Sequence, residues 1–247
     1  SNISLPDVVF GCDITADNST TYMSFFSQMD TYGDGYAGIG VWRAAFKPLV
    51  DRIADTDIRL QWFCCDRSTG VTDASGNRIT LIRDTQSPVA VEYQAVKFIG
   101  TGRDNIKAGV FSGWELGDYI YLRSEEAYMI KMEALAHKGS AEAVTELNSF
   151  MKTRQPDYNY TFTNKADLIE EIIYQKRVEF WGEGLEYIDN RRLNIPVDRT
   201  DETWGAENNN HFSAGKFRYN QEDRPFLYQL PLSEIENNSQ LSPSDQN

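Results

Sequence analysis

The spacing of apolar positions divides the chain into an irregular first part and a helical second part. Up to about residue 118, short apolar runs such as Pro6–Phe10 and Leu60–Cys64 are separated by polar and glycine-rich stretches. From about Tyr119 onward, apolar residues recur at the three- and four-residue spacing of amphipathic helices. We therefore expect an irregular lobe over 1–118 and a helical region over 119–247, joined in one compact unit.

The second part predicts four helices, each with its own boundary signals. The first covers 119–138 and stops at Gly139, and its apolar residues lie on two faces, so neighbours should pack on both sides. Ser140 caps the second helix, Asn164 opens the third, and a shorter fourth extends to about Arg192. The two faces of the first helix carry Ile120, Ala127, Ile130 and Ala134 on one side, and Tyr121, Tyr128, Met132 and Leu135 on the other.

Helices of this kind, joined by short turns, predict stacked helical hairpins, and hence a mainly α fold. The chain holds only about two such hairpins, whereas a free-standing stack needs about three. We therefore expect the stack to continue in sequence outside this chain.

The first part offers two local predictions. The spacing of Trp42, Phe46 and Ile53 predicts a helix over 41–53, with Pro48 in its first turn or at a kink. A β-hairpin is predicted over 69–83, with Ser75-Gly76-Asn77 as its turn.

Charge limits the choice of partner. Acidic residues outnumber basic ones 37 to 24, which gives a formal net charge of −13. Nucleic-acid binding depends on clustered Lys and Arg, and anionic lipid attracts basic surfaces. Neither partner is expected, while neutral ligands remain open.

No residue set suited to catalysis is evident. Glu179, Glu183 and Glu186 lie on adjacent turns of one predicted helix and its end, whereas glycoside hydrolysis needs two carboxylates across a cleft. The sequence also lacks the GxSxG segment of serine hydrolases and the HExxH segment of zinc hydrolases. We predict that the protein is not an enzyme and has no catalytic residue.

Metal and nucleotide sites are likewise not expected, and neither is a cofactor. The two histidines, His137 and His211, have no partners at ligand spacing. A calcium site on Asp30 and Asp34 lacks the spacing of a calcium loop. Gly33–Gly38 formally matches the dinucleotide fingerprint, but no buried strand precedes it. Cys12, Cys64 and Cys65 make no disulfide framework, so we expect all three to be reduced packing residues. Only the redox state of the adjacent Cys64 and Cys65 stays open.

Four further segments carry sequence motifs: Tyr121–Leu135, Glu146–Arg154, Leu168–Leu193 and Tyr228–Asn238. In this order they are similar to a helix of pattern RxAExxLxxAEAL, a helix end of pattern LNxxRxR, a helix of pattern ERRxELxxEGxRxxDLxR and a closing YPIPxxEIxxN. Taken together, the four segments resemble the SusD/RagB family. Upstream, Asp55–Arg59 is similar to the family's DxR stretch. Departures include Glu125 where the family usually has Ala, and Met151 where an Arg is more usual.

The resemblance implies a SusD-like superhelix of tetratricopeptide-like hairpins, with this chain as the C-terminal part of a longer protein. It also implies a lipoprotein on the extracellular face of the outer membrane, anchored by lipid on an N-terminal part that has no counterpart here. The implied activity is the binding of oligosaccharides for a SusC-like TonB-dependent transporter. Two alternatives stay open: binding of peptides or other nutrients, and a helical module that only scaffolds the transporter.

The family motif residues are interpreted as structural. Arg123 with Glu126, and Arg177 with Glu183 or Asp189, suit ion pairs between packed helices. A charge buried between helices needs a partner, so these residues should identify the fold and not the ligand site.

Two groups of residues are candidates for ligand binding. The first is Tyr32, Asp34, Tyr36, Trp42 and Arg43, in an irregular segment where binding residues tend to concentrate. Exposed aromatic rings there would stack on the C–H faces of sugars, although Trp42 could instead pack inward with Phe46. The second group is Trp204, Asn208, Asn209 and His211.

Overall fold

The computed structural model describes residues 4–15, 17–18, 24–30, 35–37, 43–64, 92–98, 117–223 and 227–245. By its internal contacts the chain forms two compact units, Ser1–Glu179 and Phe180–Asn247. The division at residue 118 that the sequence suggests stays a prediction. Long-range pairing joins segments on either side of that residue, as the next paragraphs show, so unit 1 combines the irregular lobe with three helices.

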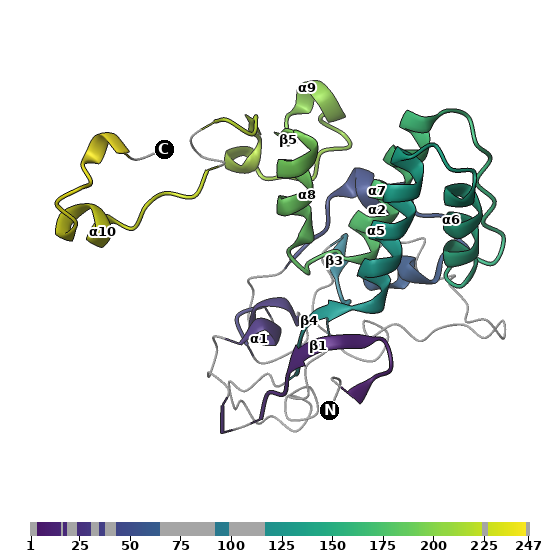
Figure 1. The fold of residues 1–247 in the computed structure, drawn as a ribbon, viewed down its shortest axis with the longest axis horizontal. Helices are drawn as coiled ribbons and strands as arrows, with labels where there is room; N and C mark the ends of the chain where they lie inside the picture. The colour runs from purple at the N-terminus through teal and green to yellow at the C-terminus, as the bar shows by residue number, and fades with distance from the viewer. Residues whose placement is uncertain are drawn as a thin grey trace. The chain divides into compact units, whose positions relative to one another are not determined.

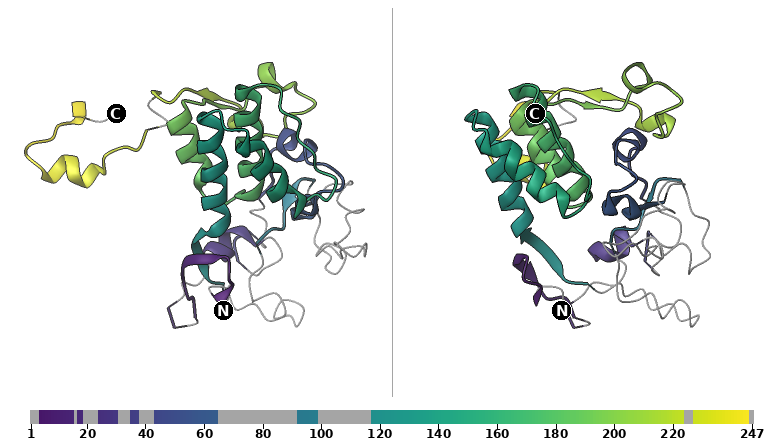
Figure 2. Two further views of the ribbon diagram at one scale, coloured as in Figure 1. Left: turned by 45° about the vertical axis from the view of Figure 1, so that its right-hand side comes forward. Right: turned by 90° about the vertical axis from the view of Figure 1, so that its right-hand side faces the viewer.

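Three helices form the core of unit 1: α5 (Ser124–His137), α6 (Glu142–Lys152) and α7 (Lys165–Glu179). Figure 1 shows α5 beside α6 and α7, and Figure 2 shows them side by side in two further views. The prediction of a mainly α fold is therefore confirmed. The buried apolar side chains of these helices are Met129, Met132, Ala136, Ala143, Leu147, Met151, Leu168, Ile172, Ile173 and Val178.

Gly139, Asn164 and Ser140 lie at the helix boundaries that the sequence predicts for them. Gly139 stops α5 with a φ of +72°, a left-handed conformation that glycine adopts without strain. The Asn164 side chain accepts a hydrogen bond from the backbone N–H of Asp167 and so caps α7. Ser140 Oγ accepts one from the Glu142 N–H at the start of α6.

The first predicted helix is wrong at its start. Tyr119–Arg123 is a strand, β4, which pairs antiparallel with β1 (Val8–Cys12), and α5 begins only at Ser124. A run of aromatic and branched residues fits a strand well, and β1 supplies backbone partners from more than a hundred residues upstream. Cys12, expected to be a packing residue, is an exposed free thiol on β1.

The predicted two-faced character of α5 also needs correction. Met132 is buried, but Tyr128 on the same predicted face is exposed, and so are Ala127, Ile130 and Ala134 on the other. Within unit 1 the helix therefore buries one side only.

The helix predicted over 41–53 is shorter than expected. It is α2, Lys47–Asp51, because Pro48 lacks an N–H and occupies the first turn. Residues before it are extended: Ala45 N donates to Tyr93 O, and Ala95 N donates to Arg43 O. The remaining elements of this lobe are α1 (Phe25–Met29), the 3-10 helix η2 (Ile58–Trp62), and strands β2 (Phe63–Cys64) and β3 (Gln94–Ala95). The predicted hairpin at 69–83 lies outside the described residues.

Unit 2 is built on α8 (Leu185–Leu193), the short fourth helix expected from the sequence. A small antiparallel pair of strands, β5 (Val197–Asp198) and β6 (Arg218–Tyr219), encloses the polar segment between them. Further short helices of unit 2 are α9 (Asp201–Trp204), η4 (Ser213–Gly215), α10 (Leu232–Asn237) and η6 (Pro243–Asp245). Within the described ranges, no helix combines the length and apolar character needed to cross a bilayer.

Candidate ligand-binding site

The short helix α1 fixes the backbone that carries Tyr36. Ser24 caps α1 by accepting a hydrogen bond from the Ser27 N–H at 3.1 Å. The backbone of 35–37 then rests on Ser27: Tyr36 N donates to Ser27 Oγ (3.4 Å), and Ala37 N donates to Ser27 O (2.9 Å). Ser27 and Ala37 are fully buried, so the residue between them in this loop is held in a defined place.

Gly35 allows this close approach. A Cβ atom built at position 35 would lie 2.3 Å from Ser27 Oγ and 2.6 Å from Ser27 Cα. Real Cβ atoms do not come so close to a backbone atom, so any other residue would push the loop away from α1.

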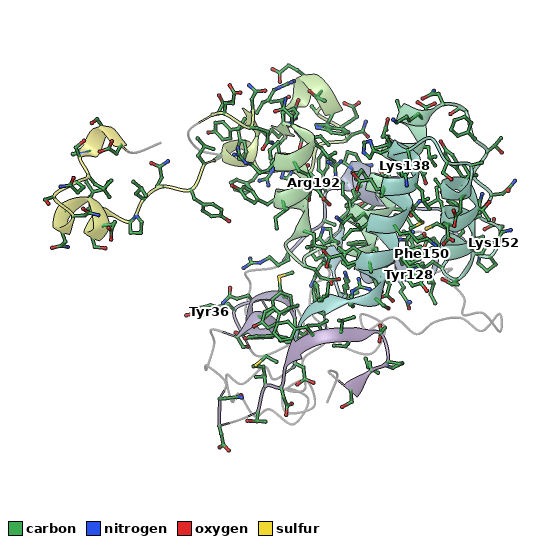
Figure 3. The ribbon with its side chains drawn as sticks, in the orientation of Figure 1. Tyr36, Tyr128, Lys138, Phe150, Lys152 and Arg192 are labelled. Atoms are coloured by element: carbon green, nitrogen blue, oxygen red, sulfur yellow. The ribbon has the colours of Figure 1, made fainter. Side chains whose placement is uncertain are left out.

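The Tyr36 side chain is 40% exposed and lies beside α1 (Figure 3). Arg43, a second predicted ligand-binding residue, also contacts this helix, because its Nη2 donates to Gln28 Oε1 at 3.3 Å. Tyr36 and Arg43 thus both contact α1, Tyr36 through its backbone at Ser27 and Arg43 through its side chain at Gln28. Tyr32, Asp34 and Trp42 lie outside the described residues.

An aromatic cluster joins α1 to strand β4. The Phe25 ring packs edge-on against Phe98, with centroids 4.9 Å apart, and against Tyr119, at 6.2 Å. The Tyr119 hydroxyl accepts a hydrogen bond from the Phe25 N–H at 2.9 Å. The cluster therefore ties α1 to β4 and gives the Tyr36 loop a rigid support.

The sequence did not reveal this cluster. Its members come from separate segments of the chain, and Tyr119 was expected on a helix. Spacing along the sequence carries no signal for such a contact.

Glu179, the last residue of α7, is the centre of a buried cluster of charged side chains. Its carboxylate lies 3.0 Å from Arg154 Nε, 3.1 Å from Arg123 Nη1 and 3.3 Å from Arg59 Nη1. Burial alone would raise the pKa of Glu179, but Arg154, together with Arg59 and Arg123, lowers it to about 2. The group is therefore a carboxylate at any physiological pH, and its contacts leave it no role as an acid or base.

The same cluster fixes the lobe to the helices. Arg59 is held by Asp57, with Nη2 2.7 Å from Oδ2, and Asp57 also caps η2 by accepting from the Arg59 N–H. Lys97 Nζ donates to the main-chain carbonyl of Glu179 at 2.7 Å. Asp57 and Arg59 thus act as a structural anchor between the lobe and α7.

The structure places partners beside two of the motif residues. Arg123 contacts Glu125 (3.4 Å) and Glu179 (3.1 Å), while its pairing with the half-buried Glu126 stays a prediction. Arg123 ends strand β4 and precedes the first turn of α5, so it does not lie within the helix. Asp189 pairs with Arg192, 2.7 Å away on the same helix. Pairing of Arg177 with Glu183 or Asp189 would join the two units, and it stays a prediction.

The second candidate group, in unit 2, divides into structural and exposed residues. Asn209 is buried; its amide donates to Arg199 O (3.0 Å) and Asp201 Oδ1 (2.8 Å), and its Oδ1 accepts from the His211 N–H. Trp204 is part-exposed, and its indole N–H donates to Asp198 O at 2.9 Å.

The other side chains of this group fit the same division. Asn208 is exposed. Burial lowers the pKa of His211, and Arg199 and Lys216 lower it further, so the ring is neutral at pH 7. In this group Trp204 and Asn208 are exposed, His211 is part-exposed and Asn209 is buried.

Metal binding finds no support in the part of the chain that the structure describes, where no three His, Cys, Asp or Glu side chains are grouped for an ion. The candidate calcium ligand Asp30 is fully buried at the end of α1, and Asp34 lies outside the described residues.

Comparison with known proteins gives one family and several similar folds. A model of the SusD family matches residues 93–247. No match is found among curated proteins.

The similar solved structures include a SusD-like carbohydrate binding protein from Bacteroides vulgatus, with a TM-score of 0.66 and 19% identity over 97% of this chain and 49% of that one. A putative sugar binding protein from Bacteroides vulgatus has a TM-score of 0.62 and 21% identity over 98% of this chain and 45% of that one. A SusD superfamily protein from Parabacteroides distasonis has a TM-score of 0.60 and 16% identity over 98% and 49%. The chain therefore spans about half the length of these structures and shares their fold.

Proposed function

Because this chain belongs to the SusD family, we propose that it binds oligosaccharides without catalysis and presents them to a SusC-like TonB-dependent transporter. The proposed location is the extracellular face of the outer membrane. Two of the similar structures bear descriptions as a carbohydrate binding and a sugar binding protein, which supports an oligosaccharide as the ligand.

One observation on this chain carries the proposal. Tyr36 is part-exposed on a loop that Ser27 of α1 holds through backbone hydrogen bonds, and Arg43 contacts the next residue of that helix, Gln28. A flat aromatic face suits the C–H face of a sugar ring, while amide and guanidinium groups suit its hydroxyls. Rigid placement lowers the ordering cost of binding.

A non-catalytic role is supported by the electrostatics of the charge cluster. The most perturbed carboxylate near the lobe, Glu179, is buried among three arginines and has a pKa of about 2. A general acid for glycoside cleavage needs a raised pKa.

A glycan array followed by thermal melting tests the proposal. We expect at least one oligosaccharide to raise the melting temperature, since a ligand that binds only the folded state stabilises it. The same oligosaccharide should be recovered without new reducing ends. The proposal is wrong if glycans across the array give no shift, or if one is hydrolysed with turnover.

An interaction module that only scaffolds the transporter is the second candidate function. The exposed rings of Phe10 on β1 and Tyr121 on β4, with centroids 5.6 Å apart, favour it, since exposed apolar patches mark interaction sites. In that case no glycan or peptide would shift the melting temperature. A shift by peptides alone would instead assign the protein to peptide uptake.

A further inference from the structure

Unit 2 contains a cavity of about 350 Å³ beside the β5–β6 pair. One wall is the segment between the end of α8 and β5, and the other is the turn that follows β6. Ligand sites occupy about 300–1,000 Å³, so this cavity suits a small ligand such as one sugar unit. The residues that line it are Asn194, Pro196, Asn220, Gln221, Glu222 and Asp223.

Gln221 ties the two walls of the cavity together. Its side-chain Nε2 donates to the main-chain carbonyl of Ile195, and its main-chain carbonyl accepts from Arg191 Nη1. These bonds join the turn after β6 to α8 and to the segment before β5. The walls are therefore held in place without a ligand, which lowers the ordering cost of binding one.

The Gln221 side chain also has an unsatisfied acceptor. The residue is only 5% exposed, and its Oε1 has no hydrogen-bond partner among the described residues. Reversing the amide would not help, because its oxygen would then face the carbonyl oxygen of Ile195. Buried acceptors without a donor are rare in native structures. Because Gln221 lines the cavity, a ligand that carries hydrogen-bond donors can satisfy this oxygen.

The other lining side chains favour the same kind of ligand. Asp223 Oδ2 accepts from the Asn220 N–H at 2.6 Å, while the Glu222 side chain is exposed. Ionised carboxylates only accept hydrogen bonds, whereas the Asn194 amide both donates and accepts. Pro196 adds an apolar ring to this polar lining. Sugar hydroxyls can donate to the carboxylates and exchange bonds with the amides, and the C–H face of a sugar suits an apolar ring.

A metal ion fits the cavity less well than a sugar. Calcium takes six to eight oxygen ligands, whereas two carboxylates line this cavity and the Arg191 guanidinium already bonds the Gln221 carbonyl beside it. We propose that the cavity is a second carbohydrate site, which binds one neutral sugar unit through its hydroxyls. It rests on the proposed function for the class of ligand, and not for the location of the site.

Nuclear magnetic resonance with free hexoses tests this site. Glucose, galactose and mannose are added separately to the ¹⁵N-labelled chain. We expect at least one of them to shift the side-chain amide signal of Gln221 and the backbone signals of 194–195 and 220–223 in a saturable way. Asn194→Gly removes a lining amide at a φ of +55°, which glycine adopts freely. It should weaken binding of that hexose by about 2- to 12-fold, the effect of one hydrogen bond.

Asn237→Gly is the matched control, because Asn237 ends helix α10 of the same unit and does not line the cavity. This variant should bind the hexose as the parent chain does. The proposal is overturned if none of the three hexoses shifts these signals, or if Asn194→Gly binds as tightly as the parent. Saturable shifts with calcium chloride alone would also overturn it and assign the cavity to a cation.

Failure of this site is distinguishable from failure of the proposed function. If an oligosaccharide from the glycan array shifts the signals of Gln28, Tyr36 and Arg43 while the hexoses leave Gln221 unmoved, the proposed function stands and the second site is rejected. If a hexose shifts the Gln221 signal equally in the parent and in Tyr36→Ala, the second site is supported whatever the Tyr36 loop binds.

Discussion

Arg59 and Glu179 form a buried ion pair across 120 residues of sequence, with Nη1 and Oε2 3.3 Å apart. Arg59 belongs to the irregular lobe and Glu179 to the last turn of α7. The lobe has little regular secondary structure of its own in the described residues, so contacts of this kind fix its η2 segment to the helices. The charge cluster therefore links the fold of the lobe to that of α7.

Glu179→Gln is expected to lower the free energy of unfolding by about 3–5 kcal/mol, because it removes the buried countercharge that Arg59, Arg123 and Arg154 share. Urea denaturation measures the change. Glu170→Gln is the matched control on the same helix; its exposed pair with Arg52 should change stability by less than about 0.5 kcal/mol. Equal effects of the two variants would contradict a structural role for the cluster.

The pH dependence of stability should carry the signature of Glu179. Its pKa is about 2 in the folded chain and ordinarily 4.5, so the folded state favours the carboxylate. The stabilisation is complete above about pH 4.5 and is lost as the pH falls towards 2, amounting to about 3 kcal/mol. Denaturation measured from pH 7 to 2 should show a steeper loss for the parent chain than for Glu179→Gln. Parallel curves would mean that other carboxylates cause the loss.

Tyr36→Ala is expected to weaken oligosaccharide binding by about 2- to 12-fold, since one stacking contact is worth about 0.5–1.5 kcal/mol. Its melting temperature should change little, because the ring is part-exposed. Titration calorimetry with a glycan that the parent binds gives the affinity. Phe162→Ala removes another exposed ring from unit 1 and should leave the affinity unchanged. If the two variants bind equally well, Tyr36 is not a ligand contact.

Gly35→Ala tests whether binding depends on the position of the 35–37 loop, because it moves the loop and keeps the Tyr36 ring. The new methyl group would meet Ser27 at 2.3 Å and displace 35–37 from α1. We expect a loss of affinity at least as large as that of Tyr36→Ala, although the ring is retained. Gly139→Ala makes the same chemical change at a φ of +72° with no atom within 4 Å, so it should cost about 1–2 kcal/mol of stability and leave binding intact. Unaltered affinity of Gly35→Ala would show that the loop tolerates movement.

The helices α6, α7 and α8 could be predicted from the sequence because their signals are local. Asn164 caps within three residues, and the apolar spacing of α7 is read from its own residues. The start of α5 could not be predicted in this way. Tyr119–Arg123 fits either a helix or a strand, and the choice depends on pairing with β1, far upstream. Pairing with a distant strand decides whether this segment is a helix or a strand, and the local spacing of apolar residues gives no information about that partner.

The candidate site was predictable to a smaller degree. An aromatic, irregular segment pointed to Tyr36 and Arg43, because residue type and loop character are local properties. The contact of Gly35 with Ser27, and that of Phe25 with Phe98 and Tyr119, join residues from separate segments. The sequence also predicted Asn209 of the second group as a ligand-binding residue, whereas its side chain is buried and hydrogen-bonded to Asp201.

Asn209→Ala and Trp204→Ala should therefore act differently in unit 2. Asn209 donates to Arg199 O and Asp201 Oδ1 while buried, so its loss leaves polar groups unpaired at a cost of about 1–3 kcal/mol. Hydrogen exchange of the backbone over 197–219 should rise in this variant, with glycan affinity unchanged. Asn208→Ala, an exposed neighbour with the same side chain, should leave exchange as it is in the parent. Trp204 donates its indole N–H to Asp198 O but keeps part of its ring exposed, so Trp204→Ala should lower affinity only if this surface contacts the glycan. A loss of affinity with Asn209→Ala and normal exchange would reverse the assignment and make Asn209 a ligand contact.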